Sequence, residues 1–279
     1  MDDNPARNAS ARRMPTVYLP HGGGPCFFMD PPPQAPQTWD GMAAYLRGLA
    51  ASIGERPRAL LVVSAHWETP RPTVNSGAAP GMLFDYYGFP EHTYQLSWPA
   101  PGSPQLAAKV RDLLQSAGID CDEDAARGYD HGVFVPLLLA WPDADIPTTQ
   151  LSLQAGLDPA AHLAIGKALE PLRDEGVLII GSGMSYHNLR EFFAADARVV
   201  ADAEQFDTAL TAALLDPVPA AREAQLIRWK GLPAALAAHP RAEHLLPLMV
   251  VAGAAGNDPG RRMWTGPIFG KPVSAFHFG

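Results

Sequence analysis

Short hydrophobic runs and longer amphipathic stretches alternate along most of the chain. Runs rich in β-branched residues are typical of buried strands, and alternation is typical of half-buried ones; together they predict strands at 16–20, 59–68, 93–98, 146–153, 177–182 and 273–278. Hydrophobic periodicity predicts helices at 39–53, 104–117, 159–172, 199–227 with a break at 217–219, and 245–256. The largely β-α-β-α order predicts a single α/β domain over 15–279, with a mostly parallel or mixed central sheet and helices on both faces.

Three of the predicted strands run into a histidine. His21 follows the strand at 16–20, His66 closes the run that begins at residue 59, and His187 follows the strand at 177–182 after a short turn. In open α/β sheets, ligands bind in the crevice outside the carboxyl ends of the strands. We therefore expect the three imidazoles to converge there and to form a metal site.

Two further histidines, His131 and His244, lead into hydrophobic segments and are also expected to project from element ends. The remaining four are assigned no function: His92, His162, His239 and His277. Of these, His162 on a predicted helix and His239 beside a proline are expected to face solvent. The long spacings exclude zinc-finger and H-E-x-x-H patterns. Three histidines would fit a hydrolytic zinc site, and two with a carboxylate would fit a non-haem iron oxygenase, so the metal stays open.

The stretch at 21–24 reads His-Gly-Gly-Gly, which also marks the oxyanion loop of esterases. An esterase needs a G-x-S-x-G nucleophile elbow after a strand, and the chain has none. The stretch is better explained as a site loop in which glycines let the backbone approach a ligand. The connection at 69–90, dense in proline, glycine and aromatic residues, is expected to form a pocket wall.

Composition and charge limit the classes of partner. The chain has 279 residues, of which 47% are hydrophobic, and its longest nearly apolar run, 245–256, is too short to span a bilayer. A net charge of -8 without a Lys and Arg run argues against nucleic acid and favours a small molecule. Residues 1–14 are expected to be a disordered tail without a secretory signal, and two cysteines make no disulfide framework, which predicts a cytoplasmic protein. A homo-oligomer is left open.

Five stretches taken together carry a resemblance to a known family. They are Leu-Pro-His-Gly-Gly-Gly-Pro at 19–25, Ser-Ala-His-Trp-Glu at 64–68, Tyr-Asp-His-Gly at 129–132, Gly-Met-Ser-Tyr-His-Asn-Leu at 183–189 and Glu-His-Leu-Leu-Pro-Leu at 243–248. This ordered set resembles the class III extradiol ring-opening dioxygenases, from about residue 16 to the C-terminus. The branch it is most similar to is the DOPA 4,5-dioxygenase type, related to the catalytic subunit of protocatechuate 4,5-dioxygenase.

The resemblance implies one Fe(II) or Zn(II) ion per chain, held by His21, His66 and His244. It places His187 as a fourth ligand or as the acid/base group, and His131 beside substrate and dioxygen. The protocatechuate branch has a glutamate ligand where this chain has His244. On a helix, the neighbouring Glu243 would point about 100° away, so we expect His244 to be the ligand.

The implied reaction opens the ring of a catechol-type substrate with O2 and yields a semialdehyde. His187 would accept a catechol proton, and His131 would stabilise or protonate the reduced dioxygen. Trp67, Tyr86 and Tyr186 are expected to belong to the core or wall more than to touch the substrate. Two alternatives stay open: a zinc-dependent hydrolase on the same scaffold, and a metal-binding or pocket protein without catalysis.

Overall fold

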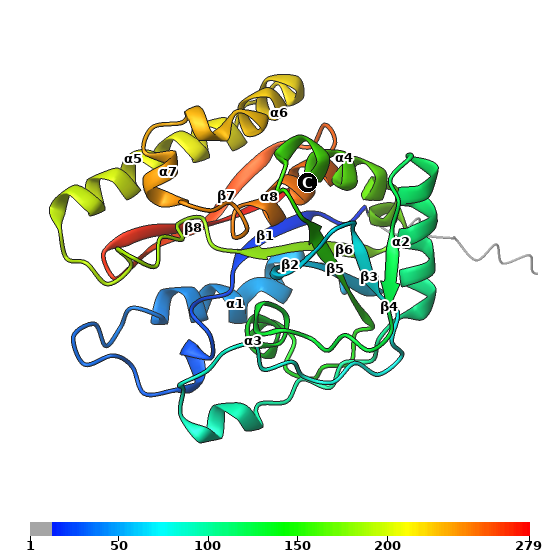
Figure 1. Cartoon of the computed structure of the whole chain (residues 1–279), viewed down its shortest axis with the longest axis horizontal. Helices are drawn as coiled ribbons and strands as arrows, with labels where there is room; N and C mark the ends of the chain where they lie inside the picture. Colours follow the sequence, from blue (N-terminus) through cyan, green and yellow to red (C-terminus); the bar gives the residue numbers. More distant parts are fainter. Residues whose placement is uncertain (1–12) are drawn as a thin grey trace, which may run out of the picture.

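The computed structural model of the chain describes residues 13–279, and its centre is one mixed sheet of eight strands in the order β4-β3-β5-β2-β6-β1-β8-β7 (Figure 1). The strands are β1 Thr16–Pro20, β2 Ala59–Thr69, β3 Thr73–Asn75, β4 Asp122–Asp124, β5 Thr148–Gln154, β6 Val177–Gly183, β7 Gly260–Ile268 and β8 Lys271–Phe278. The four central strands, β5, β2, β6 and β1, run parallel. The hairpin of β8 and β7 adds two antiparallel strands beside β1.

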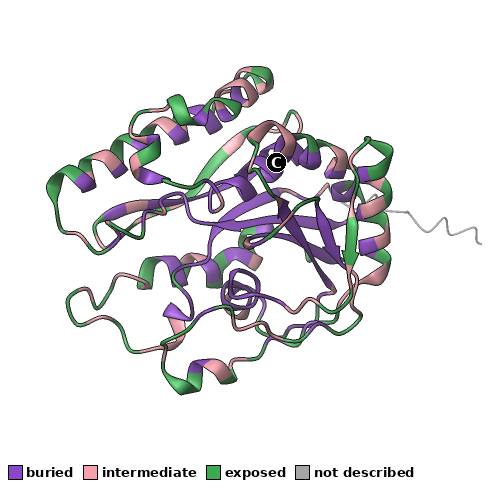
Figure 2. Cartoon of the chain, viewed as in Figure 1, coloured by how far each residue is buried: buried purple, intermediate pink, exposed green. Residues whose placement is uncertain are grey.

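Helices cover both faces of the sheet. They are α1 Asp40–Ile53, α2 Pro104–Ser116, α3 His131–Ala140, α4 Pro159–Leu169, α5 Ala197–Leu214, α6 Pro219–Ile227, α7 Ala235–Ala238 and α8 Leu246–Ala254. Helix α8 packs on β6 and β1 and is covered by α4, whereas α1 and α3 pack together on the opposite face. The sheet and α8 are buried almost throughout, while α5 and α6 alternate between buried and exposed positions (Figure 2). The predicted α/β architecture is confirmed.

One predicted strand is wrong, and three strands were not predicted: the short strands β3 and β4 and the edge strand β7. The segment at 93–98 was expected to be a strand, but Glu91–Gln95 forms the 3-10 helix η2 instead, since Thr93 turns back on Pro90 through its backbone N–H at 2.9 Å and its hydroxyl at 2.7 Å. Strand β7 was not predicted. Most of its residues are half-buried or exposed because it is the edge of the sheet, so it lacks a hydrophobic run.

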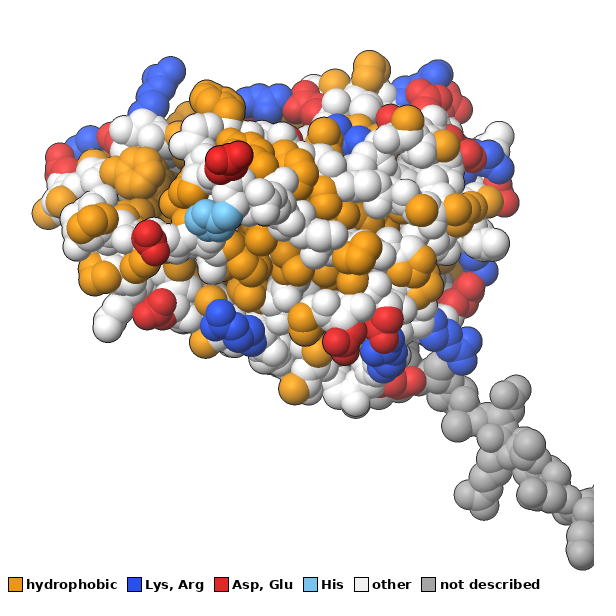
Figure 3. Space-filling model, turned by 90° about the horizontal axis from the view of Figure 1, so that it is seen from below, with side chains coloured by type: hydrophobic (Ala, Val, Ile, Leu, Met, Phe, Trp, Pro, Cys, Tyr) orange, Lys and Arg blue, Asp and Glu red, His pale blue; other side chains and the backbone are white. Residues whose placement is uncertain are grey.

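The connection from β3 to α2 runs along the bottom of the molecule as drawn in Figure 1. Hydrophobic side chains are spread over much of the face seen from below, and charged side chains lie mostly toward its edges (Figure 3). The connection also exposes Tyr87, whose side chain is 91% accessible.

At the amino end, the tail expected over 1–14 falls mostly outside the described residues. Met14 is described: it is buried, and its N–H donates to the carbonyl of Arg173 at 3.1 Å. Within residues 13–279, no helix combines the length and hydrophobicity needed to cross a membrane.

Candidate metal centre

His21 and His187 follow the carboxyl ends of two neighbouring parallel strands, β1 and β6. Strand β1 pairs with β6 until Pro20 meets Gly183, and the next N–H, of His21, still donates to the carbonyl of Gly183 at 3.1 Å. His21 is therefore fixed at the carboxyl end of the central sheet with no exposed surface. His187 lies four residues past the end of β6, and its N–H is held by the carbonyl of Ala238 at 3.0 Å.

His66 owes its direction to an irregularity in β2. The register of β2 against β5 shifts between Val63 and Glu68, so that several β2 residues stand opposite few β5 residues. A bulge of this kind bends the strand and redirects a side chain. The hydroxyl of Ser64 accepts a hydrogen bond from the N–H of His66 at 3.2 Å and donates one to Asp130 at 2.7 Å. These two bonds hold the bulge in place.

His131 is the first residue of α3, and a glycine lets that helix end approach the sheet. A Cβ on Gly132 would lie 2.6 Å from the hydroxyl of Ser64 and 3.1 Å from the ring of His66. Only a glycine allows this approach. The ring of His131 consequently lies 3.9 Å from that of His66, measured between centroids.

His244 lies in the turn before α8 and not in the helix itself. Its carbonyl accepts hydrogen bonds from the hydroxyl of Tyr18 at 2.7 Å and from the N–H of Met184 at 3.1 Å. A Cβ on Gly183 would come within 2.1 Å of that carbonyl oxygen. The close packing of β1, the end of β6 and this turn therefore sets the position of His244.

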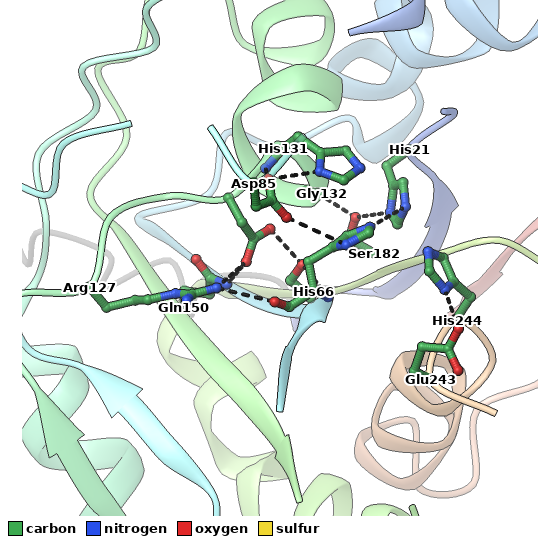
Figure 4. Close-up of polar contacts among 12 residues, drawn as sticks. His21, His66, Asp85, Arg127, His131, Gly132, Gln150, Ser182, Glu243 and His244 are labelled. Carbon is green, nitrogen blue, oxygen red and sulfur yellow. Dashed lines mark hydrogen bonds and ion pairs between the residues drawn. The ribbon is translucent and has the colours of Figure 1, made fainter. Parts of the chain in front are cut away.

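The five predicted histidines lie together at the carboxyl ends of the strands. Figure 4 shows four of them: His21, His66, His131 and His244. The His21 ring centroid lies 4.9 Å from that of His66, 5.5 Å from that of His131 and 5.2 Å from that of His244. His187 stacks on His244, with centroids 3.4 Å apart. Two groups of potential ligand atoms result: His21, His66 and His131 in one, and His187, Glu243 and His244 in the other.

Two carboxylates accept from the Nδ1 side of the rings. An oxygen of Glu243 lies 3.2 Å from Nδ1 of His187 and 3.0 Å from Nδ1 of His244. Asp85 lies 2.8 Å from Nδ1 of His131 and 3.5 Å from Nδ1 of His66. Because each carboxylate accepts a hydrogen bond from a proton on Nδ1, the Nε2 atoms of His131, His187 and His244 are left with lone pairs.

A hydroxyl orients His21 by accepting a hydrogen bond from its Nδ1, as the carboxylates do for the other rings. The Ser182 hydroxyl donates its proton to the carbonyl of Gly132, so its oxygen must accept from Nδ1 of His21 at 3.0 Å. The Nε2 atoms of His21 and His66 face each other at 3.1 Å, and when His66 carries its proton on the Nδ1 that faces Asp85, both present lone pairs. Two nitrogens about 2.1 Å from one metal ion, at about a right angle, lie about 3 Å apart, so this pair fits a metal ion.

Burial keeps these rings neutral. It lowers the pKa of His21 and of His66 well below the ordinary value, with repulsion from the neighbouring histidines adding to the shift. Burial also lowers the pKa of His244 to about 3. Burial alone would raise the pKa of Glu243, but the hydrogen bonds from His187 and His244 lower it, so the carboxylate is ionised. Neutral imidazole is the form that binds metal.

Several residues of the site were not found from the sequence. Glu243 was expected to turn away from His244 as on a helix, which is wrong because both residues lie in a turn and the carboxylate contacts the ring. Asp85 carried no pattern of its own, although it lies in the connection expected to form a pocket wall. The expectation that His162 and His239 face solvent is also wrong: both are fully buried and bond to backbone groups.

The histidines line a cavity of about 410 Å3. A glycine loop at 22–24 forms one side, and most of the remaining lining is hydrophobic. Its aromatic members are Trp39, Phe89, Phe192, Phe193 and Phe269. The aromatics singled out from the sequence do not line it: Trp67, Tyr86 and Tyr186 are buried elsewhere.

A buried lysine fixes part of the aromatic wall. Lys271, the first residue of β8, has no exposed surface. Its ammonium group donates to the carbonyls of Phe192 at 3.1 Å and Phe269 at 3.0 Å, and also to that of Ala194. It thereby joins the loop after β6 to the turn between β7 and β8.

Comparison with known proteins places this site in a family. Residues 15–270 match the family model described as the catalytic LigB subunit of aromatic ring-opening dioxygenase. The chain belongs to this family. The ring-opening dioxygenase is 44% identical to a 4,5-DOPA dioxygenase extradiol of Beta vulgaris over 74% of this chain and 76% of the relative. It is 37% identical to the dioxygenase tasH of Hapsidospora irregularis, over 95% and 85% of the two chains.

A solved structure agrees with these relatives. The ring-opening dioxygenase superimposes on the crystal structure of an uncharacterized protein from Escherichia coli K12 with a TM-score of 0.76 and 30% identity, over 96% of this chain and 100% of the other. The predicted class III extradiol dioxygenase family, in its DOPA-dioxygenase-like branch, is confirmed, and with it the extradiol ring-opening class of enzyme. Nothing in the comparisons supports the zinc-dependent hydrolase.

Proposed function

We propose that this extradiol dioxygenase opens the ring of a catechol at a single Fe(II) or Zn(II) ion held by His21, His66 and His244. The observation that carries the proposal is the pair of facing Nε2 atoms on His21 and His66, 3.1 Å apart, with both Nδ1 atoms turned to other groups. The metal, when bound, supplies positive charge that lowers the pKa of catechol hydroxyls and open positions that orient the reactants. Iron is the expected metal, since ring opening consumes O2.

His187 is proposed as the fourth ligand or as the base for the second catechol proton. Its Nδ1 is held by Glu243, so Nε2 is free to accept a proton, and the carboxylate stabilises the imidazolium that results. On the other side of the cluster, Nδ1 of His131 is held by Asp85, and this ring is proposed to stabilise or protonate reduced dioxygen. It can donate a proton from Nε2 only as the imidazolium, whose charge the Asp85 carboxylate would stabilise. In this proposal, His187 is the base and a protonated His131 is the acid.

Metal binding and oxygen uptake test the proposal directly. The chain, loaded with Fe(II) without oxygen and then given catechols and O2, is expected to consume O2 and form a yellow product. His66→Ala is expected to abolish metal retention, whereas His187→Ala keeps at least part of the metal but loses turnover. His92→Ala is the matched control, because this exposed histidine bonds only to the carbonyl of Phe28.

Two results would contradict the proposal. Absence of oxygen uptake from a fully iron-loaded chain across DOPA, caffeate, protocatechuate and alkyl catechols would remove the proposed activity. Full metal retention by both His66→Ala and His21→Ala would show that the facing imidazoles do not hold the ion.

A further inference from the structure

The cavity beside the histidines differs sharply in polarity between its two parts. One part consists of the imidazoles, and the other is built from aromatic rings packed on one another. Phe193 lies 4.8 Å from Phe269, and Trp39 lies 5.7 Å from Phe269, measured between ring centroids. The aromatic part therefore offers a hydrophobic surface to whatever extends from the metal-binding end of a substrate.

The cavity is larger than a catechol ring requires. An apolar cavity of roughly 150 Å3 is enough to hold benzene. The cavity here measures about 410 Å3, which leaves room for a substituent comparable in size to a second ring. At its mouth, Leu189 and Phe193 are 67% and 70% exposed, and both line the cavity. Large hydrophobic side chains exposed at a cavity mouth are typical of a surface that a hydrophobic ligand covers.

The charges around the cavity disfavour an anion. Of the residues that line it, none is a lysine or arginine, and the one charged side chain is that of Asp30. Arg190 follows Leu189 in the chain, but it does not line the cavity. With the catechol hydroxyls at the metal-binding end, a carboxylate on the substituent would lie in the aromatic part, where no lysine or arginine lines the cavity and Asp30 has the like charge.

We propose that the site selects catechols that carry an uncharged hydrophobic substituent, up to about the size of a second ring, over catechols that carry a carboxylate. The proposal rests on the catechol activity proposed above and adds the class of substituent. The hydroxyl pair would lie at the histidines, and the substituent would lie against Trp39, Phe89, Phe269 and, at the mouth, Phe193.

A matched pair of substrates tests this selectivity. 4-Propylcatechol and 3-(3,4-dihydroxyphenyl)propionate have side chains of the same length that end in a methyl group and a carboxylate. With the iron-loaded chain, kcat/KM is expected to be about thirtyfold higher for 4-propylcatechol, the ratio expected for an unpaired polar group in such a pocket. 4-Phenylcatechol is expected to match or exceed 4-propylcatechol. Equal or better use of the propionate would overturn the proposal.

Binding without turnover separates this inference from the proposed function. Both compounds are titrated into the iron-loaded chain under nitrogen, with tryptophan fluorescence as the signal because Trp39 lines the cavity. If they bind in the expected order but no oxygen is consumed, the catechol activity fails and the selectivity stands. If oxygen is consumed but the order reverses, the activity stands and the selectivity fails. Absence of both binding and turnover would overturn both.

Two variants at the mouth localise the selectivity. Leu189→Arg places a cation beside the cavity and is expected to raise the propionate-to-propyl ratio of kcat/KM about tenfold. Leu189→Gln, polar but uncharged, is its control and is expected to leave that ratio within about twofold. An equal change of the ratio in both variants would show that charge at the mouth does not govern the choice.

Discussion

Removing the ammonium group of Lys271 is expected to loosen the aromatic wall without touching the metal centre. In Lys271→Met, a side chain of similar length would fill the space, but three carbonyl groups would lose their donor. The acceptors belong to Phe192, which is buried, and to Ala194 and Phe269, which are half-buried, and Phe192 and Phe269 line the cavity. The backbone at Phe269 also has a φ of 47°, a left-handed conformation that a phenylalanine adopts only when its surroundings hold it there.

The magnitude follows from the hydrogen bonds. A buried acceptor left without a partner costs about 1–3 kcal/mol. Ala194 and Phe269 are partly exposed, so water can replace the lysine at those carbonyls, and we expect a loss of about 1–3 kcal/mol in the free energy of unfolding, mainly from the carbonyl of Phe192. The KM for 4-propylcatechol is expected to rise about tenfold, equivalent to about 1.4 kcal/mol, with kcat within about threefold.

Urea denaturation, iron content and steady-state kinetics check this prediction together. Lys230→Met is the control, because Lys230 is an exposed lysine whose ammonium lies 6.0 Å over the Trp229 ring and far from this wall in the chain. It is expected to match the wild type in all three measurements. The reasoning is refuted if Lys271→Met loses stability but keeps the wild-type KM, since the lysine would then stabilise the fold without positioning the wall.

Three further changes have defined outcomes. Glu243→Gln, which keeps the shape but removes the charge that orients two rings, should weaken Fe(II) affinity about 10–100-fold in a chelator competition, and unchanged affinity would contradict the role of the carboxylate. Gly183→Ala would place a Cβ 2.1 Å from the carbonyl oxygen of His244 and should therefore lose metal binding. Gly48→Ala, in α1 with open space around it, is the control and should keep the metal and raise the free energy of unfolding by about 0.5–1 kcal/mol. Burial, together with the charge of Arg261, lowers the pKa of His277 to about 4. The neutral ring therefore contributes its full stabilisation above pH 6.5, and about 3 kcal/mol of the free energy of unfolding is lost as the pH falls to 4. His277→Gln should flatten the pH profile of the free energy of unfolding, measured with urea, by that amount.

The strand-end histidines could be predicted because their signal is local. Hydrophobic runs end on His21 and His66, and in a parallel sheet the ends of neighbouring strands meet at one edge. His131 and His244 were placed by the hydrophobic segments that follow them. The distances among the rings could not be predicted, since they depend on the bulge in β2 and on the close approaches at Gly132 and Gly183.

The groups that orient the rings and line the cavity left little trace in the sequence. Asp85 comes from an irregular connection and acts through contact with His131 and His66 across the site. The aromatic wall joins Trp39, Phe192 and Phe269, which are far apart in the chain and show no shared periodicity. Strand β7 was missed for the related reason that an edge strand facing solvent needs no hydrophobic pattern.

The placement of His21 just after the first strand and His244 just before the last helix has a consequence for biosynthesis. A chain emerging from the ribosome presents its early histidines long before the turn that carries His244 has been made, and domains generally fold as units. Products of interrupted translation would contain several imidazoles but not the turn that completes the proposed ligand set. With that ligand set, metal content measured per polypeptide is expected to report how much of a preparation is full length and folded.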